Sequence, residues 1–166
     1  GIDADAMVVL VNSIGDESDR TKYLEILKEH LMDIKDKLCH DCQTRIDLNT
    51  LRVFDCKNNN CQALIKDAPL ILDHICDENR KHFETVLKSL EKFGINYKID
   101  KNMVRGLDYY THTVFEIFPT SEIEASQGAL LGGGRYDGLF ANLSDGKLDF
   151  PAVGFASGVE RVVEAI

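Results

Sequence analysis

The order of apolar and polar residues predicts a buried strand followed by a long amphipathic helix. Residues 7–11 are all apolar, include β-branched side chains and precede a turn-forming segment at residues 12–15, which is typical of a short buried strand. From Ser18 onward, apolar residues recur three or four positions apart and so form one stripe of a helix. The stripe consists of Leu24, Leu27, Leu31, Ile34 and Leu38.

The next part of the chain carries weaker signals. Residues 39–61 lack a helical period and contain three consecutive asparagines, so we expect a loop with short extended pieces. A short helix is expected after Pro69.

A second amphipathic helix and a strand are expected before residue 100. Asp77 is a suitable N-cap, and Gly94 lies just beyond the expected last turn. The apolar stripe between them consists of Phe83, Val86, Leu87, Leu90 and Phe93. Residues 95–99 then alternate apolar and polar, which predicts an edge or half-buried strand.

Beyond residue 100 the pattern changes to strand-like alternation interrupted by glycines. Residues 109–118 are rich in β-forming side chains, and glycine-containing segments follow at residues 132–134 and 153–155. We place a boundary near residue 100, between a mostly helical module and a glycine-rich β module. The opening strand is assigned to the β module, whose leading edge needs a partner. The expected fold class is α+β.

Composition and charge narrow the classes of function. The chain has 166 residues, 44% of them hydrophobic, so it can bury a core. Its 19 basic and 28 acidic residues give a net charge of −9, so binding to nucleic acid would need a local basic patch. No apolar run is long enough to span a membrane, and no export leader is expected. Five cysteines, an odd number, favour a reducing compartment, and we expect a cytoplasmic protein.

Four of the five cysteines have the outline of a zinc site. The pair Cys39 and Cys42 has the two-residue spacing of zinc-binding turns, whereas Cys56 and Cys61, with four residues between them, fit less well. Two such pairs can converge on one tetrahedral ion. The alternative is that these are unpaired thiols in a loop packed on neighbouring helices, and both interpretations stay open.

A second candidate site lies in residues 104–116. An arginine, Arg105, precedes the adjacent tyrosines Tyr109 and Tyr110. A buried arginine needs an anion, and its planar guanidinium suits a carboxylate or a phosphate. Paired tyrosines suit a flat ring with polar edges. A strand with aromatic cross-strand pairs is the structural alternative, but it does not account for the arginine.

Two later segments contribute further candidates. Residues 132–134 are three consecutive glycines, which allow close approach of a ligand or of another strand. Residues 154–161 indicate a strand of small and large residues that turns into a helix, with Arg161 near the helix start as a candidate phosphate ligand. Close packing of a strand on a helix explains the last segment equally well.

Together these segments resemble the C-terminal part of the catalytic domain of the histidyl-tRNA synthetase family, a family of class II aminoacyl-tRNA synthetases. Residues 105–116 are similar to the first histidine-specific signature, residues 133–139 to the second, and residues 151–161 to class II motif 3. Short segments between residues 12 and 57 resemble the insertion that this family carries between motifs 2 and 3.

The resemblance implies three regions. Residues 1–14 would supply a strand of the catalytic domain, residues 15–100 an inserted, mostly helical domain, and residues 101–166 the C-terminal part of the catalytic domain with part of its antiparallel sheet. It also implies ATP-dependent activation of histidine to histidyl-adenylate and transfer to tRNA(His). Mg²⁺ would accompany ATP, the helical domain would contact the tRNA acceptor arm, and the family assembles as a homodimer.

The resemblance further implies roles for individual residues. Arg105 would stabilise charge at the α-phosphate as the catalytic residue. The histidine pocket would be formed by Tyr109, Tyr110, Tyr136 and Gly134. ATP would be bound by Arg161 and Gly154.

The chain also departs from the family. It has no counterpart of motifs 1 and 2, of the acidic residues that recognise the histidine ring, or of the anticodon-binding domain. It looks like the middle third of a longer protein. We expect that this segment alone does not catalyse aminoacylation. Two rival functions remain: a synthetase-like regulatory subunit of histidine biosynthesis, and a zinc-stapled RNA-binding module formed by residues 15–100.

Overall fold

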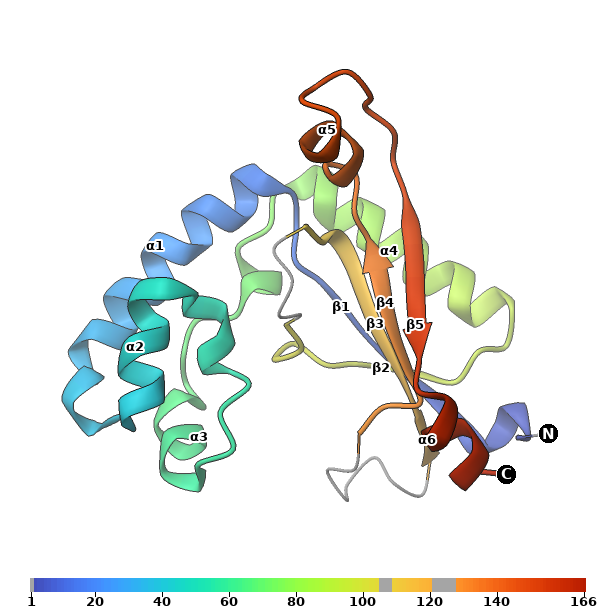
Figure 1. Ribbon diagram of the computed structural model, residues 1–166, viewed down its shortest axis with the longest axis horizontal. Helices are drawn as coiled ribbons and strands as arrows, with labels where there is room; N and C mark the ends of the chain where they lie inside the picture. The colour runs from blue at the N-terminus through green and yellow to red at the C-terminus, as the bar shows by residue number, and fades with distance from the viewer. Residues whose placement is uncertain (1, 105–108, 121–127) are drawn as a thin grey trace.

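The computed structural model describes residues 2–104, 109–120 and 128–166 (Figure 1). Its strands are β1 (Met7–Ser13), β2 (Tyr97–Ile99), β3 (Thr111–Pro119), β4 (Leu131–Arg135) and β5 (Val153–Ser157). The helices are α1 (Glu17–Asp33), α2 (His40–Leu48), α3 (Asn59–Ile65), α4 (Asp77–Lys92), α5 (Leu139–Leu143) and α6 (Val159–Glu164). Single 3₁₀ turns are η1 (Ala4–Ala6), η2 (Lys35–Lys37), η3 (Thr50–Val53) and η4 (Ile71–Asp73).

The strands form one five-stranded sheet in the order β2-β1-β3-β4-β5. β1 pairs in parallel with β2, whereas the pairs from β1 through β3 and β4 to β5 are all antiparallel. The predicted α+β class is confirmed, and the opening strand belongs to the sheet, as expected. The strand expected at residues 95–99 is also present, as β2 at the sheet edge.

Helix α4 covers one face of the sheet, behind the strands in the view of Figure 1. Val86 and Leu90 of this helix line one hollow together with Val9, Val11 and Ile117 of the sheet. The helix begins at Asp77, one residue after its N-cap, so the prediction of Asp77 as the cap is wrong by one position.

Helices α1, α2 and α3 form a lobe to the left of the sheet in Figure 1, which we call the helical lobe (residues 16–66). Of the stripe predicted for α1, Leu27 and Leu31 are fully buried and Leu24 is half-buried, whereas Ile34 and Leu38 lie beyond the last residue of the helix. The helix ends at Asp33, and a 3₁₀ turn carries the chain on to buried Leu38.

The expectation of a loop at residues 39–61 is wrong. This segment contains α2, η3 and the start of α3. Each α-helix is short and buries a single pair of side chains four positions apart, Cys42 with Ile46 in α2 and Cys61 with Ile65 in α3. One member of each pair is a cysteine, and without counting cysteine as apolar the sequence shows no helical period here. The short helix expected after Pro69 is the single 3₁₀ turn η4.

A polar joint connects the helical lobe to α4. Asp16 caps α1 by accepting the backbone N–H of Asp19 at 2.9 Å, and Asp19 accepts the backbone N–H of Cys76 at 3.0 Å. The side-chain amide of Asn79 donates to Asp19 Oδ2 at 2.6 Å and to Asp16 Oδ2 at 2.9 Å. Asp19 is only 3% exposed, so these hydrogen bonds satisfy a buried carboxylate.

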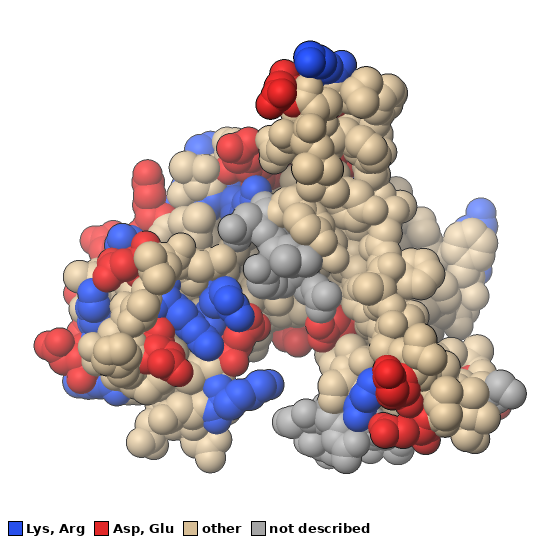
Figure 2. Space-filling view, viewed as in Figure 1, with Lys and Arg blue, Asp and Glu red and all other residues tan. Residues whose placement is uncertain are grey.

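The boundary near residue 100 does not separate two bodies in space, because β2 pairs with β1 and α4 lies against the same sheet. The limits 15–100 for an inserted domain stay a prediction. Charged side chains are dense over the helical lobe in Figure 2, whereas the visible surface over the sheet is mostly uncharged. Among the described residues, no helix is both long and apolar enough to cross a membrane.

Candidate functional site

The face of the sheet opposite α4 carries a patch with almost no side chains. In β4, Gly134 pairs with Gly154 of β5, and Gly132 pairs with Ala156. Neighbouring Arg135 points to the α4 face, where it contacts His82. Because side chains alternate along a strand, Gly134 and Gly132 face away from α4. We call Gly132, Gly134, Gly154 and Ala156 the glycine floor.

Three tyrosines gather at one end of the glycine floor. The ring centroids of Tyr109 and Tyr110 are 4.8 Å apart, and the ring of Tyr136 lies 5.6 Å from Tyr109 and 6.2 Å from Tyr110. Tyr136 packs roughly edge-on to both other rings. The structure thus brings together the three tyrosines that were predicted to share a pocket, although they come from two segments of the chain.

The glycines are required by this packing. A Cβ atom on Gly134 would lie 2.7 Å from the carbonyl oxygen of Thr113 and 2.8 Å from Cδ1 of Tyr110. A Cβ atom on Gly154 would collide with the hydroxyl of Tyr136. Close approach over Gly134 was predicted for a ligand or another strand, whereas the groups that lie close to Gly134 and Gly154 here are tyrosine side chains. Their roles toward histidine and ATP stay predictions.

Tyr110 is held from the helical lobe. It is only 5% exposed, and its carbonyl oxygen accepts a hydrogen bond of 2.6 Å from Nη1 of Arg20 in α1. This contact joins residues 90 positions apart. The sequence analysis did not identify Arg20, because nothing in the local pattern of a charged helix face indicates a partner on a distant strand.

The opposite end of the floor is marked by Arg161 in α6. Its Nη2 donates to the carbonyl oxygen of Gly128 at 2.5 Å, and its Nη1 lies 3.7 Å from the carboxylate of Glu164. Arg161 therefore lies beside the segment that precedes β4, whereas Tyr136 directly follows the last residue of β4. A five-residue strand spans about 17 Å. Arg105, the predicted catalytic residue, lies outside the described residues.

Between these two ends lies the carboxylate of Glu116, which belongs to the first signature segment but was assigned no role from the sequence. Glu116 of β3 pairs with Gly132, in the same row of the sheet as Ala156. Its side chain therefore projects on the floor side, between the tyrosines and Arg161. The strand pattern alone could not show that Glu116 lies on this face, because the face of a strand residue is known only once the pairing register is known.

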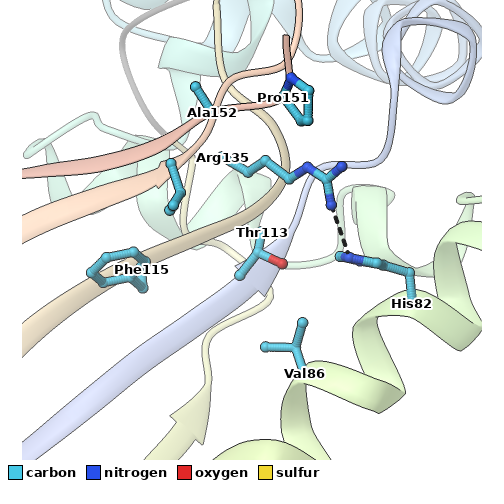
Figure 3. Close-up of a pocket in the computed structure, with 8 residues that line it drawn as sticks. His82, Val86, Thr113, Phe115, Arg135, Pro151 and Ala152 are labelled. Atoms are coloured by element: carbon cyan, nitrogen blue, oxygen red, sulfur yellow. Dashed lines mark hydrogen bonds between the residues drawn. The ribbon is translucent and has the colours of Figure 1, made fainter.

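The α4 face of the sheet holds a separate cavity of about 520 Å³, which Figure 3 shows in close-up. His82 and Val86 come from α4, Thr113 and Phe115 from β3, and Arg135 from β4. This cavity is on the other side of the sheet from the tyrosine rings, so it is distinct from the predicted histidine pocket.

A charged network borders that cavity. Nε of Arg135 lies 2.8 Å from both carboxylate oxygens of Asp137, and its Nη1 lies 3.2 Å from Nε2 of His82. His112 Nε2 is 3.6 Å from Asp137. Burial lowers the pKa of His112, and the positive charge of Arg135 lowers it further. His112 has a positive φ of 52°, at an irregularity in the pairing of β3 with β4.

The four cysteines predicted as metal ligands also come together, in the helical lobe. The Sγ atoms of Cys39, Cys42, Cys56 and Cys61 all lie within 4.8 Å of one another. Burial raises the pKa of the Cys42 and Cys61 thiols, whereas a hydrogen bond from the Cys42 backbone lowers the pKa of Cys39 to about 7. The fifth, Cys76, is exposed and lies apart from these four.

Comparison with known proteins agrees with the resemblance drawn from the motifs. The sequence profile of the histidyl-tRNA synthetase family matches residues 7–162. The chain belongs to the histidyl-tRNA synthetase family. Histidine–tRNA ligase from Halothermothrix orenii is 48% identical over 158 residues, which cover 95% of this chain and 37% of that protein. The chain thus spans little more than a third of this curated family member.

Two solved structures share the fold of this chain. The crystal structure of apo S. aureus histidyl-tRNA synthetase matches with a TM-score of 0.71 at 35% identity, over 99% of this chain and 39% of that chain. A Bacillus halodurans protein described as an ATP phosphoribosyltransferase regulatory subunit/histidyl-tRNA synthetase matches with a TM-score of 0.53 at 19% identity, covering 99% of this chain and 45% of that one. The second likeness concerns the fold alone.

Proposed function

We propose that this chain provides the histidine-binding and ATP-binding face of a histidine–tRNA ligase. One observation carries the proposal: the glycine floor has a tyrosine cluster at one end and Arg161 at the other. A ligand lying along β4 on this floor would meet aromatic rings at one end and a guanidinium at the other. Histidyl-adenylate has a matching polarity, with an imidazole at one end and a nucleotide at the other.

The reaction assigns a task to each end. The histidine carboxylate attacks the α-phosphorus of ATP and pyrophosphate leaves. A hydroxyl at the 3′ end of tRNA(His) then attacks the histidyl carbonyl, and AMP leaves. Tyr109, Tyr110 and Tyr136 would enclose the imidazole, because tyrosine offers a flat apolar ring and a polar hydroxyl. Arg161 would bind ATP. Arg105 keeps its proposed role of stabilising charge at the α-phosphate.

The floor itself contributes shape and charge. Gly134 and Gly154 keep it low enough for the tyrosine rings to pack directly over the backbone. Glu116 projects beside Gly132 and would attract the positively charged amino group of histidine. Mg²⁺ bound with ATP would neutralise part of the phosphate charge. None of these groups transfers a proton, so their contribution is positioning and electrostatic stabilisation.

The wider biology follows from family membership. We propose histidine, ATP and tRNA(His) as substrates, a homodimer as the assembly and the cytoplasm as the location. The helical lobe is proposed to contact the acceptor arm of tRNA. A regulatory subunit of histidine biosynthesis is the less favoured alternative, because the likeness to the Bacillus halodurans protein is 19% in sequence, against 48% for the ligase from Halothermothrix orenii.

The experiment compares two glycines in a synthetase of full family length that contains this segment. Gly134→Ala presses on the Thr113 carbonyl and forces the Tyr110 ring away, because the added Cβ would lie 2.7 Å from that oxygen and 2.8 Å and 3.0 Å from two ring atoms. Displacing an aromatic ring from its contact with a ligand costs roughly 1.4 kcal/mol, which is about tenfold in affinity. We therefore expect the KM for histidine in ATP–pyrophosphate exchange to rise about tenfold, with the KM for ATP nearly unchanged.

Gly138→Ala is the matched control. No atom lies within 4 Å of a Cβ at this position, and its φ of −80° suits alanine. This variant should exchange pyrophosphate like the parent enzyme. An equal rise of the two KM values in Gly134→Ala, or the same loss in both variants, would contradict a histidine pocket over Gly134.

A further inference from the structure

Four cysteine side chains from two separate segments converge inside the helical lobe. Cys39 is the N-cap of α2 and Cys42 lies in its first turn, whereas Cys56 follows η3 and Cys61 lies near the start of α3. Three of the four are buried and Cys39 is half-buried. The lobe thus concentrates sulfur atoms at the point where α2 and α3 meet.

The separation of the sulfur atoms suits a single tetrahedral ion. Zinc binds thiolates at about 2.3 Å, which places two sulfurs of one tetrahedron about 3.8 Å apart. Cys39 Sγ and Cys56 Sγ are 3.8 Å apart, and all four Sγ atoms lie within 4.8 Å of one another. Only a small inward shift of the wider pairs is needed to complete the tetrahedron.

Backbone N–H groups point at the sulfurs. The N–H of Cys39 donates to Cys61 Sγ at 3.2 Å, and the N–H of Asn58 donates to Cys56 Sγ at 3.4 Å. A neutral thiol is a weak acceptor, whereas a metal-bound thiolate carries negative charge that such donors stabilise. These contacts form the outer shell that a thiolate metal site requires.

The surrounding structure needs an internal link. Helix α2 has nine residues and α3 has seven, and helices shorter than about 12 residues are marginal without tertiary support. Between them the chain runs through a 3₁₀ turn and an irregular segment to residue 58. A metal ion at the cysteines would join the starts of α2 and α3 to the end of η3.

We infer that Cys39, Cys42, Cys56 and Cys61 bind one structural zinc ion. Four thiolates in a tetrahedron favour zinc over oxygen-preferring cations such as Mg²⁺. Four protein ligands leave no open coordination position, so the ion stabilises the lobe and takes no part in the adenylation chemistry. The inference is independent of the proposed ligase activity, because it concerns the helical lobe and not the glycine floor.

The test measures metal content in the purified full-length protein. Elemental analysis should find one zinc per chain. Replacement of zinc by Co²⁺ should give the visible absorption bands and the thiolate charge-transfer band of tetrahedral sulfur coordination. This spectrum needs no substitution, so it tests the inference even if cysteine variants fail to fold.

Variants locate the ion. Cys39→Ser, at the half-buried rim, and Cys61→Ser, in the buried interior, should lose zinc. Cys76→Ser is the control, because Cys76 is exposed and outside the cluster, and it should retain one zinc. Zinc well below one per chain in the parent protein, iron in its place, or equal zinc in Cys61→Ser and Cys76→Ser would overturn the inference. So would a disulfide between any two of the four cysteines, detected by peptide mapping without reduction after chelation in denaturant.

Discussion

The helical lobe and the sheet organise their candidate sites in different ways. On the sheet, backbone pairing from β1 through β5 fixes which residues face the glycine floor, and the tyrosine rings pack directly on that backbone. In the helical lobe, short helices surround four cysteines, and the side chains themselves form the link. The site on the sheet is therefore pre-formed by backbone pairing, whereas the stability of the helical lobe depends on the ion that its cysteines bind.

The two regions also differ in surface. The lobe is covered by charged side chains of both signs, whereas most of the visible surface over the sheet is uncharged (Figure 2). Val153 and Phe155 of the edge strand β5 are 71% and 69% exposed, and Val159 of α6 is 70% exposed. An exposed edge strand with apolar neighbours is suited to further protein contacts. The lobe thus has the charged surface of a solvent-exposed region, whereas the exposed edge strand β5 is suited to contact with another protein segment.

Zinc removal should give the largest effect and separate the two regions. Structural zinc contributes on the order of 10 kcal/mol to small domains, so chelation should release α2 and α3 while the sheet stays folded. Hydrogen exchange followed by mass spectrometry should show protection in residues 40–65 falling about 1,000-fold or more. Protection in β1 and β3 should change little. An equal loss of protection in both regions would show that the stability of the lobe depends on zinc no more than that of the sheet.

Loss of the joint between the two regions should have a middle-sized effect. Asn79→Ala removes the only side-chain amide that the described residues offer to both Asp16 and Asp19, and it leaves a buried carboxylate with fewer donors. A charged group that loses such a hydrogen bond typically costs about 2–3 kcal/mol. Urea denaturation should show a fall of that size in the free energy of unfolding.

The control for the joint is another asparagine. Asn96 is exposed, and within the described part of the chain its side-chain amide donates a single hydrogen bond, of 3.2 Å, to the carbonyl oxygen of Met7. Asn96→Ala should therefore lower the free energy of unfolding by about 1 kcal/mol or less. Equal effects of Asn79→Ala and Asn96→Ala would show that the joint does not hold the regions together.

The smallest effect should come from pH. Burial, Arg135 and His82 lower the pKa of His112, and the weaker influences of Asp137 and Asp16 oppose this. Unfolded histidine has a pKa of about 6.5, so below that pH the unfolded chain takes up a proton that folded His112 resists. The contribution is fully present above pH 6.5 and is lost as pH falls toward the folded pKa. The free energy of unfolding should decline over this range by less than in Asn79→Ala.

His112→Asn isolates this contribution. Asparagine tolerates the positive φ of 52° better than most residues, so the backbone can stay as it is. The variant should show a flatter dependence of unfolding free energy on pH just below 6.5. The same slope in the variant and in the parent protein would rule out His112 as its source.

The sequence predicted the elements with long apolar patterns and missed those with short ones. α1 and α4 were predicted because each repeats its period several times, and β1 because its residues 7–11 are continuously apolar, whereas α2 and α3 bury only one pair of side chains each. The period-based search also treated cysteine as a possible ligand and not as a core residue. In this lobe the same cysteines are both buried core residues and candidate metal ligands.

The candidate site was predicted by residue type but not by arrangement. The tyrosines and glycines stood out in the motifs, yet only the register shows that Tyr110 packs on Gly134 and that Glu116 shares their face. Arg20 could not be found from the sequence, because its contact with the Tyr110 carbonyl crosses from α1 to the segment before β3. Local patterns specify elements, whereas such contacts arise only when distant elements pack.

The most direct test of the proposed function is a crystal structure of the full-length protein with histidine and a non-hydrolysable ATP analogue. We expect the imidazole among Tyr109, Tyr110 and Tyr136, and the nucleotide along the glycine floor toward Arg161. Histidine bound instead on the α4 face, in the cavity lined by His82 and Arg135, would contradict the central claim.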